Sequence, residues 1–338
     1  MTLFVDQYEG RRVLVTGHTG FKGFWLTSWL LDLKAEVAGF SLDVPTEPSG
    51  FTVLGLEKRI RHIVGDVRNP DALQSAMRDF RPEIVFHMAA QSLVRPSYSD
   101  PVGTFATNSM GTLNVLEAVR SCDSVRALVL ITSDKCYRND EWVWGYRENY
   151  RLGGNDPYSA SKACAELIAH SYFTSFFKDG TTRAATARAG NVIGGGDWAL
   201  DRIVPDCARA WAEGRPVAIR SPWATRPWQH VLEPLSGYLW LGARLLRKAE
   251  QTAEKQGLTG PDCASESFNF GPPADVNATV EQVATELARH WPGFLLDMDR
   301  DGHGQKHEST LLKLCCDKAL AYLGWKPALN LEESIAFT

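Results

Sequence analysis

Short, almost continuous apolar runs alternate with helical patterns through the first 190 residues, and few folds accommodate that alternation. Strands without alternating polar residues are buried on both faces, and helices between them allow the strands to be parallel. The pattern therefore predicts an α/β fold, with a doubly wound parallel sheet of the Rossmann type. The predicted strands lie at 12–16, 36–40, 62–64, 83–89, 126–132 and 183–188.

Prolines next to capping residues mark where the predicted helices begin. Asn69-Pro70 and Asp100-Pro101 combine an N-cap side chain with a proline in the first turn, and a long helix is predicted to start near Pro157. After residue 190, glycines and prolines divide the chain into shorter elements. A helical pattern then returns at 231–248, and a buried strand is predicted at 267–271.

This change of rhythm predicts two unequal domains. Residues 1–189 and about 229–271 are expected to form a dinucleotide-binding domain. Residues from about 190 to 228 and from 272 to 338 are expected to form a smaller, discontinuous lobe that binds the substrate. The last helical pattern, at 331–337, runs to the end of the sequence, and we expect the helix to continue beyond it.

The composition excludes several classes of protein. Hydrophobic residues make up 44% of the chain, which can bury a large core, and the net charge of −4 disfavours binding to nucleic acid. No apolar run is long enough to span a membrane and no signal-peptide pattern opens the chain, which predicts a cytoplasmic protein. Seven cysteines without a C-x-x-C pair argue against a disulfide framework, and Cys315 and Cys316 are interpreted as packing residues.

A glycine-rich segment, G-x-x-G-x-x-G, joins the first predicted strand to the first predicted helix. One glycine permits a tight turn, one lets a pyrophosphate approach the backbone, and one lets the helix pack against the strand. The phosphates would lie at the positive N-terminus of the helix, whereas a glycine turn without a ligand is the weaker alternative. We predict that the loop binds a dinucleotide through Gly17, His18, Thr19, Gly20, Phe21, Lys22 and Gly23.

Residues after the next three strands are candidates for the rest of the cofactor. Asp43 can accept hydrogen bonds from the adenosine ribose, although Ser41 lies nearer the strand end and Asp43 could instead be a turn residue before Pro45. An acidic residue favours NAD, but we expect discrimination against NADP to be weak. Asp66, next to Val67, is assigned to the adenine amino group. Small residues after the fourth strand would accommodate a flat ring at Ala89, Ala90 and Gln91.

Tyr158 and Lys162 form a Y-x-x-x-K pair inside the long predicted helix. The i, i+4 spacing places both side chains on one face of the helix. A tyrosine with a pKa near ~10 is a poor base at neutral pH, but the lysine ammonium and a positive nicotinamide both favour the phenolate and lower that pKa. The pair therefore predicts a base that deprotonates an alcohol during hydride transfer.

Together these motifs resemble the extended short-chain dehydrogenase/reductases that act on nucleotide sugars, over nearly the whole chain. The resemblance implies a tightly bound NAD that is regenerated in each cycle. It assigns the family's strand-five Ser/Thr to Thr132-Ser133 and its structural asparagine to Asn108, near the cofactor.

Asp134 and Lys135, directly after Ser133, distinguish between the chemistries of that family. Epimerases usually carry small or hydroxylated residues there, whereas a 4,6-dehydratase needs an additional acid and base. The Asp-Lys pair resembles the CDP-D-glucose 4,6-dehydratases, as do the segments 41–49, 90–96, 191–198 and 220–230.

This second resemblance implies a mechanism. Tyr158, helped by Lys162 and Ser133, removes the C4 hydroxyl proton while NAD takes the C4 hydride. Lys135 then removes the C5 proton or stabilises the enolate, Asp134 protonates the departing C6 oxygen, and the hydride returns to C6. The product would be CDP-4-keto-6-deoxy-D-glucose, which usually feeds dideoxyhexoses of bacterial lipopolysaccharide O-antigen.

The resemblance also assigns the substrate, CDP-D-glucose, to the second lobe. Arg226 matches the arginine of that family that contacts the diphosphate. A planar guanidinium suits this role, since it can bind phosphate in bidentate fashion. Rings of Trp198, Trp223 and Trp228 could lie against the base, ribose or sugar. The further candidates for substrate contacts are Ser92, Arg95, Asn191, Arg202, Arg220 and His307.

Two other features concern assembly and metal binding. Helical stripes at 100–120 and 157–178 could form the four-helix interface of a homodimer, with a tetramer left open. His303 and His307 have H-x-x-x-H spacing but no third ligand, so no metal site is predicted. Two other functions remain open: a nucleotide-sugar 4-epimerase, and a non-catalytic dinucleotide-binding protein.

Overall fold

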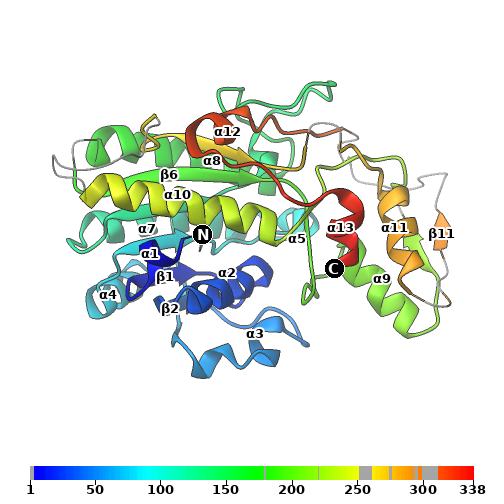
Figure 1. The fold of residues 1–338 in the computed structure, drawn as a ribbon, viewed down its shortest axis with the longest axis horizontal. Helices are drawn as coiled ribbons and strands as arrows, with labels where there is room; N and C mark the ends of the chain where they lie inside the picture. The colour runs from blue at the N-terminus through cyan, green and yellow to red at the C-terminus, as the bar shows by residue number, and fades with distance from the viewer. Residues whose placement is uncertain are drawn as a thin grey trace.

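The computed structural model (Figure 1) describes residues 4–178, 180–219, 221–250, 261–273, 276–291, 293, 296–298 and 311–338. At its centre lies a seven-stranded parallel sheet in the order β10-β6-β5-β4-β1-β2-β3. The strands are β1 (Arg12–Thr16), β2 (Glu36–Ser41), β3 (Arg61–Val64), β4 (Ile84–His87), β5 (Ala127–Ile131), β6 (Arg183–Ala189) and β10 (Ser267–Phe270). Every strand predicted for the sheet is present, and the doubly wound α/β fold is confirmed.

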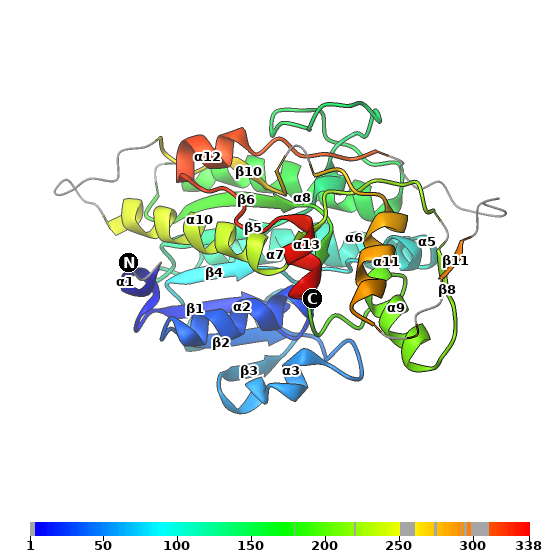
Figure 2. The ribbon, with the colours of Figure 1, turned by 45° about the vertical axis from the view of Figure 1, so that its right-hand side comes forward.

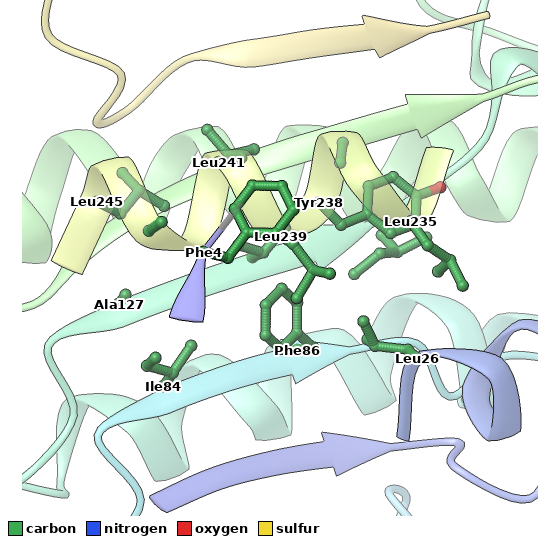
Figure 3. Close-up of a cluster of buried hydrophobic side chains, with 14 of the residues drawn as sticks. Phe4, Leu26, Ile84, Phe86, Ala127, Leu235, Tyr238, Leu239, Leu241 and Leu245 are labelled. Carbon is green, nitrogen blue, oxygen red and sulfur yellow. The ribbon is translucent and has the colours of Figure 1, made fainter. Parts of the chain in front are cut away.

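Helices cover both faces of this sheet, each over its own hydrophobic cluster. On one face lie α1 (Val5–Tyr8), α2 (Phe21–Asp32), α10 (Leu232–Glu250) and α12 (Asp317–Leu323). On the other lie α4 (Pro70–Phe80), α7 (Gly111–Arg120) and α8 (Pro157–Tyr172), with α6 (Pro101–Phe105) and the π-helices η2 (Ala106–Met110) and η4 (Phe173–Phe177). Figure 3 shows the first cluster, in which Phe86 of β4 and Leu26 of α2 lie beneath Leu235 and Leu239 of α10.

The helix starts follow the local chemistry. Asn69 caps α4 by accepting from two main-chain N–H groups, whereas Asp100 and Asp156 cap α6 and α8 by accepting from one each, and a proline follows every one of these caps. The predicted start near Pro157 is therefore confirmed. β4 ends two residues earlier than predicted: the Met88 N–H is shared between the main-chain oxygen of Thr16, at 3.1 Å, and the Thr16 hydroxyl, while the Ala89 N–H bonds the hydroxyl at 3.2 Å.

The part of the chain predicted to form the second lobe folds into short elements, several of which lie on the right in Figure 2. They are β7 (Val192–Ile193), α9 (Ile203–Ala212), β8 (Val217–Ile219), β9 (Gln229–His230), α11 (Val280–Arg289), β11 (Leu296–Met298) and α13 (Leu331–Ala336). The remaining elements are α3 (Gly50–Val53), α5 (Val94–Ser99) and the 3₁₀ turns η1 (Leu56–Lys58) and η3 (Asp134–Cys136).

α12 departs from the predicted division, which assigned all of 272–338 to the second lobe. It packs against α10 and β10, because Ala319, Leu323 and Trp325 are apolar and join the core beneath them. All seven cysteines are free thiols, and Cys316 packs beside Gly271 as expected. Within the described ranges, no helix has the length and apolar character needed to cross a membrane.

Candidate active site

The glycine loop between β1 and α2 is shaped by backbone contacts. Gly17 has φ +74°, and a Cβ there would lie 2.7 Å from the Ala89 nitrogen. A Cβ on Gly23 would lie 2.0 Å from the Gly17 oxygen. Gly20 differs, because its nearest neighbour would be 3.4 Å away, and this N-cap residue offers no side chain to the first-turn N–H groups of α2. The loop therefore fits a pyrophosphate that accepts from those N–H groups.

At the adenosine end, polar contacts bind the loop to β2 and β3. The Ser41 hydroxyl bonds His18 Nδ1 at 2.8 Å and accepts from the Thr19 N–H at 3.4 Å. His18 Nε2 lies 2.7 Å from His62 Nδ1, and burial lowers the pKa of His18 to about 3. The His18 side chain is thus neutral and fully buried, which leaves only its backbone for the predicted contact with the cofactor.

The two acidic candidates for the adenosine differ in their surroundings. Asp43 is exposed. The Thr19 hydroxyl donates to its main-chain oxygen at 2.5 Å and not to its carboxylate. Asp66 is held by Arg68, whose guanidinium lies 2.5 Å away and lowers the pKa of the carboxyl. Val67 is buried against Gly111. The roles assigned to these residues stay predictions.

Residues after β5 and on α8 meet at one cavity of about 380 Å³, a size that suits a small-molecule ligand. Ser133, Asp134, Lys135 and Tyr158 line it. Lys162 lies behind them, buried, with Nζ 3.4 Å from the Ile131 oxygen. The predicted catalytic residues are thus brought together, although only four of them line the cavity itself.

Burial controls the protonation of this cluster. It raises the pKa of Asp134, against the influence of Lys135, Ser133 and Arg226. The Ser133 hydroxyl donates to one Asp134 oxygen at 3.0 Å, while the buried Oδ2 has no hydrogen-bond partner among the residues that the structure describes. A protonated Asp134 could donate from that oxygen to a ligand.

Tyr158 behaves differently from the prediction. Burial raises its pKa to about 12, although a hydrogen bond with Ser133 acts to lower it. Burial also lowers the pKa of Lys162 to about 8, opposed by the Glu166 carboxylate. In the chain alone, desolvation of the phenolate therefore outweighs stabilisation by nearby positive charge.

A buried ion pair supports the cluster from behind. Glu166, one helical turn after Lys162, lies 2.8 Å from Arg188 of β6, and both side chains are almost fully buried. Glu166 also accepts from Thr132, the residue before Ser133. Sequence analysis missed this network, although the i, i+4 spacing of Lys162 and Glu166 was a signal for it.

Replacing Arg188 with methionine should lower the free energy of unfolding by about 3–5 kcal/mol, because it leaves the Glu166 carboxylate buried without its cation. Chemical denaturation measures this loss. Arg215→Met is the matched control, since Arg215 pairs with Glu213 on the surface and its loss should cost no more than about 1 kcal/mol. Equal losses in the two variants would contradict the prediction.

Asn108 is buried in the π-helix η2 and acts through its hydrogen bonds. Its side chain accepts from the Gln91 N–H at 2.8 Å and donates to the Ser161 hydroxyl at 2.9 Å, and Ser161 in turn donates to the main-chain carbonyl oxygen of Tyr158. π-Helical turns occur frequently at functional sites. Asn108 thus joins the segment after β4 to the helix that carries Tyr158.

The second lobe closes the cavity with cationic side chains. Arg226 is buried and close enough to Asp134 to influence its pKa. Arg202 bonds Asp197 at 3.0 Å and the Ser92 hydroxyl at 3.4 Å. Other predicted substrate residues that line the cavity are Arg95, Asn191 and Trp228, and residues that the sequence analysis missed include Tyr98, Asn155, Asp197 and Asp201.

Other candidates lie elsewhere. Trp223 and Trp198 do not line the cavity, and Trp223 is 63% exposed, because the turn that carries it faces solvent. Arg220, His303 and His307 lie outside the described residues. In the parts of the chain that the structure describes, no group of His, Cys, Asp or Glu side chains could hold a metal ion.

The parallel sheet, its glycine loop and the Tyr158–Lys162 pair, with Tyr158 lining the cavity and Lys162 buried behind it, define a dinucleotide-dependent enzyme of the short-chain dehydrogenase/reductase type. A family model described as GDP-mannose 4,6 dehydratase matches residues 14–338, and the chain belongs to that family.

The chain is also similar to individual proteins of known name. The chain is 47% identical over 336 residues to the CDP-glucose 4,6-dehydratase of Salmonella typhimurium. The aligned region covers 97% of this chain and 89% of that protein. It is 25% identical to a probable UDP-glucuronate 4-epimerase of Rhizobium meliloti, over 96% of this chain and 95% of that protein. Its fold matches a dTDP-glucose 4,6-dehydratase of Bacillus anthracis solved with NAD, with a TM-score of 0.76, 19% identity, and coverage of 97% and 95%.

Proposed function

We propose that this protein catalyses the NAD-dependent 4,6-dehydration of CDP-D-glucose to CDP-4-keto-6-deoxy-D-glucose, and is therefore a hydro-lyase. The observation that carries the proposal is Asp134, a buried acid with an unpartnered oxygen beside Lys135 and Tyr158 in one cavity. A 4-epimerase needs no such acid, and 47% identity to a CDP-glucose 4,6-dehydratase favours the cytidine nucleotide. We place the reaction in the cytoplasm, as a supply of precursors for surface polysaccharide.

The first step is oxidation at C4 of the glucose. NAD, when bound, accepts the C4 hydride and later returns it to C6. Tyr158, hydrogen-bonded to Ser133, takes the proton of the C4 hydroxyl. The Lys162 ammonium stabilises the phenolate from one helical turn away, and the Glu166 carboxylate helps to keep that ammonium charged.

The second step is loss of water across C5 and C6. The 4-ketone acidifies the C5 proton, which Lys135 removes. Burial raises the pKa of Asp134 and so favours its acid form, which donates a proton to the departing C6 oxygen. Arg226, with Arg202 as a further cation, binds the diphosphate, and both residues line the cavity.

One panel of labelled substrates tests the proposal. CDP-, TDP-, UDP- and GDP-glucose carrying deuterium at C4 are incubated with the enzyme, and the products are analysed by mass spectrometry and NMR. We expect CDP-glucose to lose one water and to carry the deuterium at C6. A product of unchanged mass would contradict the dehydratase and favour an epimerase. Loss of water without deuterium at C6 would contradict internal hydride return.

Lys135 can be tested separately from Asp134. Lys135→Met should slow the exchange of the C5 proton with solvent by about 10²-fold, because general-base catalysis contributes at least that much. NMR in deuterated water measures the exchange during C4 oxidation. Lys313→Met, which removes a lysine outside the cavity, is the control. Exchange at the normal rate in Lys135→Met would show that another group is the base.

We propose further that the protein is a homodimer. Its interface is formed by the helical segments 100–120 and 157–178, which include the exposed side of α8. α8 packs beside α6, η2 and α7, and this layer leaves apolar side chains exposed, including Val102, Met110, Leu167 and Phe176. An exposed apolar patch of this kind marks a surface for association.

Replacing both Met110 and Leu167 with glutamate should convert the dimer into a monomer, because it places charges at the centre of the apolar layer. Light scattering after size-exclusion chromatography measures the mass. Leu320→Glu is the matched control, since this leucine is 53% exposed on α12, on the other face of the sheet. A dimer that survives the double substitution would place the interface elsewhere.

A further inference from the structure

Lys22, the second residue of α2, occupies an unfavourable place for a cation. The N-terminus of a helix carries partial positive charge, which disfavours an ammonium group there. Yet the Lys22 side chain is half-buried and lines the cavity, with Nζ 3.5 Å from the Tyr238 hydroxyl of α10. In the described part of the chain, no carboxylate forms a salt bridge with it. Packing alone does not explain this charge.

The groups around Lys22 are those of the reaction site. Lys162 of α8 and Arg202, before α9, repel its charge, while Asp134 of η3 attracts it. Tyr238 of α10 interacts with both Asp134 and Tyr158, so all these groups lie in one cluster. Burial, together with the two cations, lowers the pKa of Lys22 to about 7.

We propose that the positive charge of Lys22 favours the reduced over the oxidised nicotinamide and thereby promotes oxidation of the sugar at C4. This inference rests on the proposed function. In that step, the electron pair of the C4–H bond moves as hydride to the nicotinamide, and the hydroxyl proton moves to Tyr158. The sugar is oxidised and the nicotinamide is reduced.

Charge repulsion is the physical reason. The oxidised nicotinamide is a cation and the reduced ring is neutral, so a nearby ammonium raises the free energy of the oxidised form alone. Lys22 belongs to the loop that fits the cofactor and faces the cavity where the ring must meet the sugar. Two charges near each other in a partly desolvated site interact far more strongly than in water.

The test uses CDP-6-deoxy-D-glucose, which can be oxidised at C4 but lacks the C6 hydroxyl needed for elimination. The analogue is mixed with holoenzyme, and the ratio of reduced to oxidised cofactor is read from the near-ultraviolet absorbance of the reduced ring. We expect Lys22→Met to lower this ratio by about 10-fold or more. Lys22→Arg keeps the charge and should stay within about twofold of the wild type. Lys58→Met removes an exposed lysine and should leave the ratio unchanged.

The pH dependence provides a second readout. As the pH rises through neutrality, the wild-type ratio should approach that of Lys22→Met, because the Lys22 ammonium is lost, whereas Lys22→Arg keeps its higher ratio. The other titrating groups of the cluster, Lys162, Asp134, Tyr158 and Tyr238, are shared by all three proteins and cancel in the comparison.

An unchanged ratio in folded Lys22→Met, with weaker retention of the cofactor, would overturn the proposal and leave Lys22 as a binding residue only. If Lys22→Met does not fold, the wild type and Lys22→Arg decide: parallel pH profiles overturn the proposal, and diverging profiles support it. Failure of the proposed function is distinct, since wild-type enzyme would then not dehydrate CDP-glucose at all.

Discussion

Replacing Tyr158 with phenylalanine is expected to lower kcat for CDP-glucose dehydration by about 10³-fold, because general-base catalysis contributes about 10²- to 10⁴-fold. In the proposed mechanism the Tyr158 hydroxyl takes the C4 proton, and the side chain is buried beside Ser133. Phenylalanine keeps the ring and its packing. The loss should therefore fall on kcat, with KM and the unfolding transition little changed.

Steady-state kinetics and thermal unfolding together check this result. Tyr172→Phe is the matched control, because it removes a hydroxyl from the end of the same helix, where Tyr172 donates to Glu117 at 2.7 Å. Its kcat should stay near the wild-type value. If Tyr158→Phe retained more than about one tenth of the wild-type kcat, another group would have to be the base at C4.

Replacing Asp134 with asparagine is expected to stop the reaction after its first step. Asparagine has nearly the same shape but no acidic proton, so the C6 hydroxyl leaves unassisted and water loss slows by about 10³-fold. C4 oxidation depends on Tyr158 and should continue. Reduced cofactor and a 4-keto sugar that still carries its C6 hydroxyl should therefore accumulate on the enzyme.

Rapid mixing with CDP-glucose, followed by absorbance and mass spectrometry of the quenched sugar, measures this accumulation. Asp123→Asn is the control, since the Asp123 side chain is 80% exposed beside Arg81. In the wild type, water loss should decline as the pH rises through the raised pKa of Asp134, because the acid form is then lost. A normal rate of water loss in Asp134→Asn would assign the acid elsewhere.

The elements that sequence analysis predicted best are those with strong local causes. The apolar run of β1, followed directly by glycines, allows little besides a buried strand and a phosphate-binding turn. The helices that begin with Asn69 and Asp100 are specified by a side chain that accepts the first-turn N–H groups. Each of these signals depends only on neighbours along the chain.

The structure differs from the sequence-based predictions where contacts between residues distant in the sequence decide the outcome. After β4 ends at His87, the Thr16 hydroxyl of β1 shares the Met88 N–H with the Thr16 carbonyl and accepts the Ala89 N–H. α12 joins the sheet domain because α10 and β10 present an apolar surface to it. Trp223 is exposed although its segment resembles a substrate-binding one. Periodicity and composition contain no information about these partners.

By itself, the sequence determined the class of the protein from a dinucleotide-binding α/β pattern and a Tyr-Lys pair on one helical face, and its Asp-Lys pair predicted dehydration rather than epimerisation. Only the tertiary structure decided how these groups are charged. It buries Asp134 without a partner for one oxygen, raises the pKa of Tyr158, and turns Lys22 from the cofactor loop into the cavity. The physical reason is that spacing along the chain specifies which side chains can meet, whereas desolvation and electrostatic fields depend on everything that surrounds them.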